Sequence, residues 1–247
     1  MEQLSEAGHW YDKDGLPTYT IVGANGRERN TTLRDARQHG YVPSVTTIIG
    51  MAAKPSLENW KINQALNSAI TLEQDPGESL EAFTHRCKED SKDIGRKAAE
   101  RGTIIHAMIE QGFMGGSETK AYKVIKDYLD KEFPDETWIA EDSFCSTTGY
   151  GGKIDLYSGL KDKKASKLVF DDHGMQLSAY AEGCNFKDPE RVSIFVDRED
   201  PELIAVHKWD KDTHERHLAM FNSLLTYWKL IKKYDPSEIL NEKNEAA

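Results

Sequence analysis

Long apolar runs are missing from this chain of 247 residues. Its apolar fraction is 38%, and its unbroken apolar stretches fall far short of the roughly 20 residues that a membrane-spanning helix needs. The first residues, MEQLSEAGHWYDKDG, include acidic side chains and no apolar core, which is not typical of a secretory signal. We therefore expect a cytoplasmic protein without membrane contact.

Cysteine is also scarce. The three cysteines, Cys87, Cys145 and Cys184, form no CxxC pair and have no histidine partner at zinc-like spacing. A disulfide framework is therefore not indicated. An iron–sulfur cluster held by cysteine needs four thiolates, so none is expected either.

Positive charge is in deficit, since the formal net charge is −10 at pH 7. Neutralisation of phosphates is the main source of non-specific affinity for nucleic acid, so the balance argues against a passive coat protein. It leaves open an enzyme with a local basic groove. Local basic clusters do occur, at Arg27 and Arg29, Arg34 and Arg37, Arg96 to Arg101, and Lys161 to Lys167.

Two common catalytic motifs are missing as well. The GxxxxGK[ST] phosphate-binding loop does not occur, so ATP hydrolysis is not expected. The GxSxG motif, which forms the nucleophile elbow of many serine hydrolases, does not occur either. Its absence argues against a serine hydrolase of that class.

The length and the order of apolar patterns predict a single α/β domain. We expect an amino-terminal lead with helical decoration at 1–90, a core at 91–210, and a carboxy-terminal helix and tail at 211–247. Helical periods predict helices near 56–73, 91–113, 120–133, 172–184 and 211–233, with a polar, exposed helical arm opening at Ser79. Alternating patterns predict strands at 137–144, 150–160, 192–197 and 203–209.

The segment GTIIHAMIE carries the first candidate site residues. Gly102, His106 and Glu110 are spaced four apart, which places them on one face of a helix, where the glycine allows another backbone to approach. A helical histidine with an acidic neighbour is often structural, so this segment indicates a functional site only together with the other motifs.

The segment YGGKIDLYSGLKDKK carries the second set. If Ser158 and Gly159 form a two-residue hairpin turn, Tyr157 pairs with Leu160 and Asp155 with Asp162. Two carboxylates side by side repel each other unless they share a proton or hold a cation, and Mg²⁺ or Mn²⁺ prefer such oxygen ligands. Lys164 lies two residues after Asp162 and would project from the same face.

A third segment, HGMQLSAYAEG, places His173, Gln176 and Tyr180 on one stripe of a helix. The order of the four patterns, GxxxH, GGxxD, DxK and QxxxY, resembles the RecB-like branch of the PD-(D/E)XK nucleases. The segments YVPSVTTIIG and KPSLENWKINQA are similar to the lead of phage-type and mitochondrial-maintenance-type exonucleases of that branch. The resemblance covers roughly residues 41–184.

The resemblance implies a restriction-endonuclease-like core, with a mixed central sheet flanked by helices. It implies a Mg²⁺- or Mn²⁺-dependent deoxyribonuclease, in the manner of an exonuclease, that acts on DNA in replication, recombination or repair and can meet proteins of those processes. The implied metal ligands are His106, Asp155 and Asp162, and the implied catalytic residues are Asp155, Asp162, Lys164 and, through a water, Glu110. The residues assigned to DNA binding are Gln176, Tyr180, Lys153 and Arg101.

The chain departs from the family in the short separation of Asp155 and Asp162. Family members usually have a longer hairpin, and an apolar run that leads into the second acid. Either the hairpin is short, or the segment that bears the second acid is reduced and the chain is an impaired nuclease that binds DNA or a partner protein. Asp171 and Asp172 are candidate substitutes, although their position favours capping of the next helix. An unrelated hydrolase or interaction protein is the remaining alternative.

Overall fold

The computed structural model describes residues 8–158, 163–165, 171–187, 189–197 and 199–245. The chain is a mixed α/β protein, as the sequence predicts, with 52% helix and 20% strand. Among the described residues, no helix combines the length and the apolar character needed to cross a bilayer.

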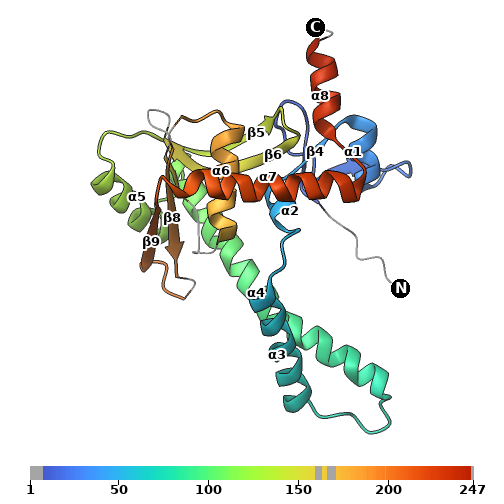
Figure 1. Ribbon diagram of the computed structural model, residues 1–247. Helices are drawn as coiled ribbons and strands as arrows, with labels where there is room; N and C mark the ends of the chain where they lie inside the picture. The colour runs from blue at the N-terminus through green and yellow to red at the C-terminus, as the bar shows by residue number, and fades with distance from the viewer. Residues whose placement is uncertain (1–7, 159–162, 166–170, 188, 198, 246–247) are drawn as a thin grey trace.

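A five-stranded sheet forms the centre of the body (Figure 1). Its order is β5-β6-β7-β8-β9, in which β7 and β8 run parallel and the other neighbours antiparallel. The strands are β5 (Trp138–Ser146), β6 (Tyr150–Ser158), β7 (Lys163–Ala165), β8 (Glu190–Val196) and β9 (Ile204–Trp209). The strands predicted at 137–144, 192–197 and 203–209 are confirmed, with shifts at their ends. The strand predicted at 150–160 is confirmed over 150–158, and positions 159 and 160 lie outside the described residues.

The turn between β5 and β6 fixes the register of the pair that carries the site. Ser146 pairs with Tyr150, which leaves a three-residue turn that ends at Gly149. Gly149 has a φ of 92°, a left-handed conformation that glycine adopts without steric cost. Every pair along the two strands follows from this turn.

Eight helices are described. They are α1 (Leu33–His39), α2 (Val45–Ile49), α3 (Pro55–Thr71), α4 (Leu80–Phe113), α5 (Lys120–Glu132), α6 (Asp171–Gly183), α7 (Thr213–Lys232) and α8 (Pro236–Glu245). Ser79 caps α4 with a hydrogen bond to the amide of Ala82, as predicted. The separate helix expected from residue 91 is wrong, because the polar stretch from Ser79 continues into it as one helix of 34 residues.

Two apolar clusters hold the sheet between helices. One joins α2, α6 and α7 to β6 through residues that include Ile48, Ala179, Tyr150, Phe221 and Trp228. The other joins α4 and α5 to β6 and β8 through Ile105, Ile125, Leu129, Leu156 and Ile194. Each fully buried large apolar side chain contributes about 1.5–3 kcal/mol, so these clusters fix α4 and α6 against the sheet.

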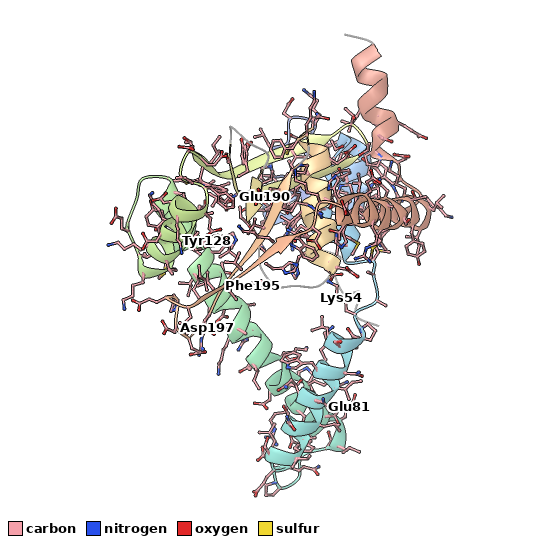
Figure 2. The ribbon with its side chains drawn as sticks, turned by 60° about the vertical axis from the view of Figure 1, so that its left-hand side comes forward. Lys54, Glu81, Tyr128, Glu190, Phe195 and Asp197 are labelled. Carbon is pink, nitrogen blue, oxygen red and sulfur yellow. The ribbon has the colours of Figure 1, made fainter. Side chains whose placement is uncertain are left out.

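An arm formed by α3 and the first half of α4 projects away from the body (Figure 1). Glu81 lies on this arm far from the body, and Lys54 lies where the arm joins it (Figure 2). The two helices approach closely at Gly95, where a Cβ atom would lie 3.4 Å from the ring of Trp60. Gly95 therefore allows the close contact between α3 and α4.

The amino-terminal lead forms two small two-stranded sheets. β1 (Trp10–Tyr11) pairs with β4 (Val42–Pro43), and β2 (Thr20–Val22) pairs with β3 (Glu28–Asn30). A further bridge joins Ser44 to Gly151, so the lead is attached to the start of β6. Residues far apart in the sequence are thereby brought to the same end of the central sheet.

Candidate metal centre

Helix α4 presents the predicted histidine to the sheet. Gly102, His106 and Glu110 line one pocket with residues of β5, β6 and β8, which confirms that the three share a face. Ile105, which precedes the histidine, is buried in the cluster between α4 and the sheet. Packing of that isoleucine sets the rotation of the helix and so directs His106 towards the strands.

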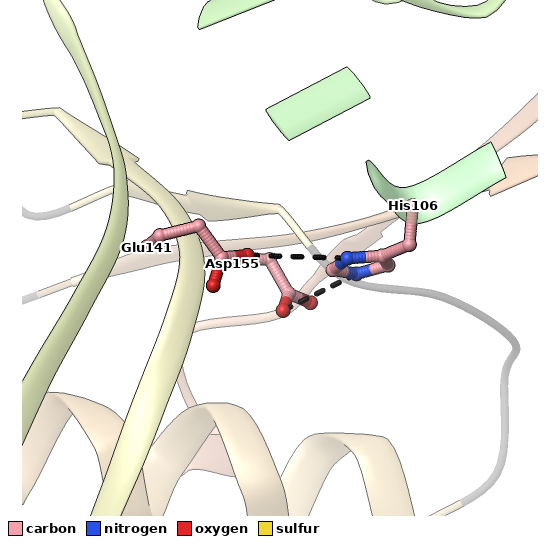
Figure 3. A group of neighbouring side chains, drawn as sticks. All are labelled: His106, Glu141 and Asp155. Atoms are coloured by element: carbon pink, nitrogen blue, oxygen red, sulfur yellow. Dashed lines mark ion pairs between the residues drawn. The ribbon is translucent and has the colours of Figure 1, made fainter. Parts of the chain in front are cut away.

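Strand β6 presents Asp155 to this histidine. His106 Nε2 lies 3.2 Å from Asp155 Oδ1 (Figure 3). The two residues are 49 positions apart in the sequence and were expected to meet, since both belong to the set of predicted ligands. Their contact is the part of the predicted site that the structure brings together.

Glu141 of β5 is a third member that the sequence did not indicate. Its neighbours Ala140 and Asp142 pair with Leu156 and Ile154, so Glu141 lies opposite Asp155. Its Oε1 lies 3.9 Å from His106 Nδ1, as Figure 3 shows, and its carboxylate also forms an ion pair with Lys153. One ligand atom from each of His106, Glu141 and Asp155 lies within 4.8 Å of the others.

The backbone of Glu141 has an unusual conformation. Its φ is 59°, in the left-handed region that a residue with a Cβ adopts at a cost of about 1–3 kcal/mol. Its side chain is only 7% exposed. A strained and buried acid is retained where its surroundings hold it in place, here through Lys153 and His106.

The register of the hairpin could have indicated Glu141. A three-residue turn that ends at Gly149 is a recognised hairpin type, and counting outwards from it pairs position 141 with position 155. The register expected from a turn at Ser158 and Gly159 instead pointed to Asp162 as the second acid.

The charges around His106 shift its pKa. The hydrogen bond with Asp155 raises the pKa of His106 above its ordinary value, and Glu141 and Glu110 add to this effect, while burial opposes it. Two carboxylates opposite each other in a sheet repel one another. Lys153, which forms an ion pair with Glu141, offsets that repulsion.

The donor set suits a divalent cation. Two carboxylates and one imidazole offer oxygen and nitrogen ligands, a combination that Mn²⁺ accepts readily and that Mg²⁺ accepts chiefly through the carboxylates. The pocket beside these donors has room for water, about 80 Å³ that a water-sized molecule can enter. Its deeper wall is apolar, with Ile105, Ile109 and Phe113 of α4 facing Leu156 and Ile194.

Gln176 and Tyr180 of α6 lie behind the site. Gln176 Nε2 donates a hydrogen bond of 2.8 Å to the Tyr180 hydroxyl. The Tyr180 ring packs against Gly152, where a Cβ atom would lie 2.7 Å from it, so the second glycine of the GG pair makes room for it. Burial raises the pKa of Tyr180, and the nearby charge of Asp155 adds to that shift.

The predicted turn at Ser158 and Gly159 is wrong. Tyr157 pairs with Lys164 and not with Leu160. Ser158 still belongs to β6, where it pairs with Trp138 and its hydroxyl donates a hydrogen bond to Glu136. Because Tyr157 lies opposite Lys164, the expected register is lost and the pairing of Asp155 with Asp162 no longer follows.

The remaining predicted residues are distributed as follows. Asp162 lies outside the described residues, and Lys164 lies in β7, opposite Tyr157. Arg101 of α4 is exposed and forms an ion pair with Glu199. Lys153 is at the site through its ion pair with Glu141.

The two candidate substitute acids are engaged elsewhere. Asp171 accepts hydrogen bonds from Arg216 and lies 3.1 Å from His217, and Asp172 forms an ion pair of 2.8 Å with Lys54. Both lie in the first turn of α6, where negative charge stabilises the helix.

Comparison with known proteins adds no assignment. No family model matches the chain, and no curated protein matches its sequence.

Proposed function

We propose that this protein is a divalent-metal-dependent DNA nuclease of the PD-(D/E)XK type, with the activity of an exonuclease. One observation carries the proposal: His106 and Asp155, selected from the sequence as metal ligands, meet across α4 and β6 and are joined there by a second carboxylate. A chance resemblance gives no reason for these residues to converge.

The residues that would hold Mg²⁺ or Mn²⁺ are His106, Glu141 and Asp155. When bound, such an ion polarises a phosphodiester and lowers the pKa of a coordinated water. In this assignment Glu141 takes a role that the sequence resemblance gives to Asp162. The order of strands, with β5, β6 and β7 following one another and α6 after them, agrees with a restriction-endonuclease-like core.

The other side chains supply positioning and charge. Lys153 carries the positive charge nearest to the two acids and would offset negative charge that develops on a cleaved phosphate. Tyr180, held by Gln176, packs on Gly152 and so fixes α6 against the strand that carries Asp155. Glu110 lies on the same face of α4 as His106 and can hold a water at the edge of the site.

The test is release of nucleotides from single- and double-stranded DNA in the presence of Mg²⁺ or Mn²⁺. The wild-type protein should degrade DNA, and Asp155→Asn should lower kcat by about 100-fold or more, because a ligand of the ion is lost. Asp127→Asn, an exposed acid on α5, is the matched control and should keep full activity.

Three outcomes separate the alternatives. Degradation that Asp155→Asn abolishes supports the proposal. Binding of DNA without degradation under any divalent ion would indicate an impaired nuclease that keeps only its binding function. Neither binding nor degradation would show that the resemblance is accidental.

A further inference from the structure

The lead of the chain places aromatic rings along the same strand that carries Asp155. β1 and the residues on either side of it hold His9, Tyr11 and Tyr19 at the amino-terminal end of β6. Tyr11 lies against Gly151, where a Cβ atom would come within 2.9 Å of its side chain. The first glycine of the GG pair therefore makes room for Tyr11, as the second does for Tyr180.

These rings lie on the side of β6 that faces the candidate site. Alternation along a strand puts Gly151, Lys153 and Asp155 on one face, in steps of about 7 Å for each two residues. Tyr11 is packed on the first of these positions and Lys153 is the second. The rings thus begin about 13 Å along the strand from the proposed metal ligand.

Tyr19 extends this surface towards Lys153. Its hydroxyl lies 2.8 Å from that of Tyr11, and the two rings meet edge to face with centroids 5.8 Å apart. Tyr11 lies on Gly151, two residues before Lys153, so Tyr19 continues the aromatic surface beside this part of β6.

His9 and Tyr19 stack on each other with ring centroids 4.6 Å apart and planes at 29°. Tyr11 is buried, whereas Tyr19 is half-buried and His9 is exposed. Hydrogen bonds from Ser44 and Thr31 hold the backbone carbonyls of His9 and Tyr19. The pair is thus a preformed aromatic stack on a rigid backbone, with one ring open to solvent.

We propose that His9 and Tyr19 form a stacking platform for a nucleobase of a single-stranded DNA segment, close to the phosphate held at the candidate metal centre. The inference rests on the proposed function and adds to it a contact with the base. Stacking of a base on an aromatic ring tolerates any sequence, because every base has a π face. The platform would hold a single strand in register along β6 without reading its sequence.

The test uses Asp155→Asn as the parent, so that binding is measured without cleavage. The ligand is a short single-stranded oligonucleotide with a fluorescent label, and binding is followed by anisotropy. Tyr19→Leu should weaken binding by about 5- to 100-fold, which is the loss expected when one base no longer stacks on an aromatic ring. Tyr19→Phe keeps the ring and should remain within about 3-fold of the parent.

An abasic series separates stacking from a structural role. Oligonucleotides with a single abasic position, moved along the strand, keep every phosphate and lose one base at a time. One position should weaken binding to the parent and have no further effect on Tyr19→Leu, because the base and the ring act as a pair. Tyr227→Leu, which removes an exposed tyrosine of α7, should show the same abasic profile as the parent.

The outcomes distinguish this inference from the proposed function. If the wild type degrades DNA but the abasic profile of Tyr19→Leu equals that of the parent, the platform is refuted and the nuclease stands. If the abasic position couples to Tyr19 but DNA is not degraded, the platform stands and hydrolysis is refuted. If the protein does not bind the oligonucleotide at all, both are refuted.

Discussion

Glu141 supplies the second carboxylate of the candidate centre. A left-handed glutamate inside an antiparallel strand has a conformational cost that an ordinary strand residue does not bear. The backbone at this position brings the carboxylate to within reach of both His106 and Lys153. Contacts with these two residues offset the strain and the repulsion from Asp155, and a bound divalent ion would offset them further.

Replacement of Glu141 tests this role directly. Glu141→Gln should weaken the binding of Mn²⁺ by about 10-fold or more, because one anionic ligand is lost. The stability of the metal-free protein should change much less, since the substitution removes both the repulsion from Asp155 and the attraction to Lys153. Titration calorimetry with Mn²⁺, alongside thermal unfolding without the ion, measures the two effects.

Glu136→Gln is a suitable comparison, because Glu136 also accepts a hydrogen bond from β6 but lies apart from the ligand cluster. It should leave the affinity for Mn²⁺ unchanged. Equal affinity in Glu141→Gln and the wild type would remove Glu141 from the centre and return the second-acid role to another residue.

A buried arginine fixes α6 behind the site. Arg191 of β8 is fully buried and donates hydrogen bonds to Ser178 of α6 and to Thr213 and the carbonyl of Asp210 at the start of α7. Its Nη1 also lies 3.2 Å from His217 Nδ1. These contacts hold the helix that carries Gln176 and Tyr180.

His217 makes this arrangement sensitive to pH. The imidazole is fully buried, and burial lowers its pKa in spite of the hydrogen bond with Asp171, which acts in the opposite direction. A histidine with a lowered pKa is held neutral in the folded protein and gains a proton on unfolding. Its contribution to stability is therefore complete above about pH 6.5 and is lost as the pH falls below that value.

We expect the free energy of unfolding of the wild type to fall more between pH 8 and pH 5 than that of His217→Gln. Each pH unit below the unfolded pKa costs up to about 1.4 kcal/mol until the folded pKa is reached. Urea unfolding at the two pH values measures the difference. His39→Gln, on the last turn of α1, is the control and should retain the pH dependence of the wild type.

The elements themselves were largely predictable from the sequence, whereas their pairing was not. The period of apolar residues located α3, α5, α6 and α7, because burial of one helical face leaves a repeating pattern. The register of β6 with β7 was predicted wrongly, since a plausible turn at Ser158 was outweighed by the contact of that residue with β5. Glu141 was missed for the same reason: its importance depends on pairing with a strand and not on any local motif.

The whole molecule consists of a body that carries the candidate centre and an arm that projects from it (Figure 1). Apolar spacing in the segment that became α3 predicted a helix, but Leu57, Ile62 and Leu66 remain at least 43% exposed there. The arm packs one helix on one other helix, so most of each surface has no neighbour. Periodicity in a sequence predicts a helix, but it does not tell whether the apolar face is covered.

The same helix, α4, belongs to both parts. Its first half forms the arm with α3, and its second half presents His106 to the sheet and is anchored there by Ile105. The centre therefore depends on the folding of the body, in which α4 and the two strands of the β5–β6 hairpin supply one ligand each. The proposed function requires that His106, Glu141 and Asp155 bind one ion together.

A crystal soaked in Mn²⁺ and measured for anomalous scattering tests this most directly. We predict one strong peak bounded by His106, Glu141 and Asp155, with ligand distances of about 2.0–2.4 Å. The peak should weaken in crystals of Glu141→Gln. A wild-type crystal without a peak at these residues, or with its peak at a site that excludes both His106 and Asp155, would contradict the account.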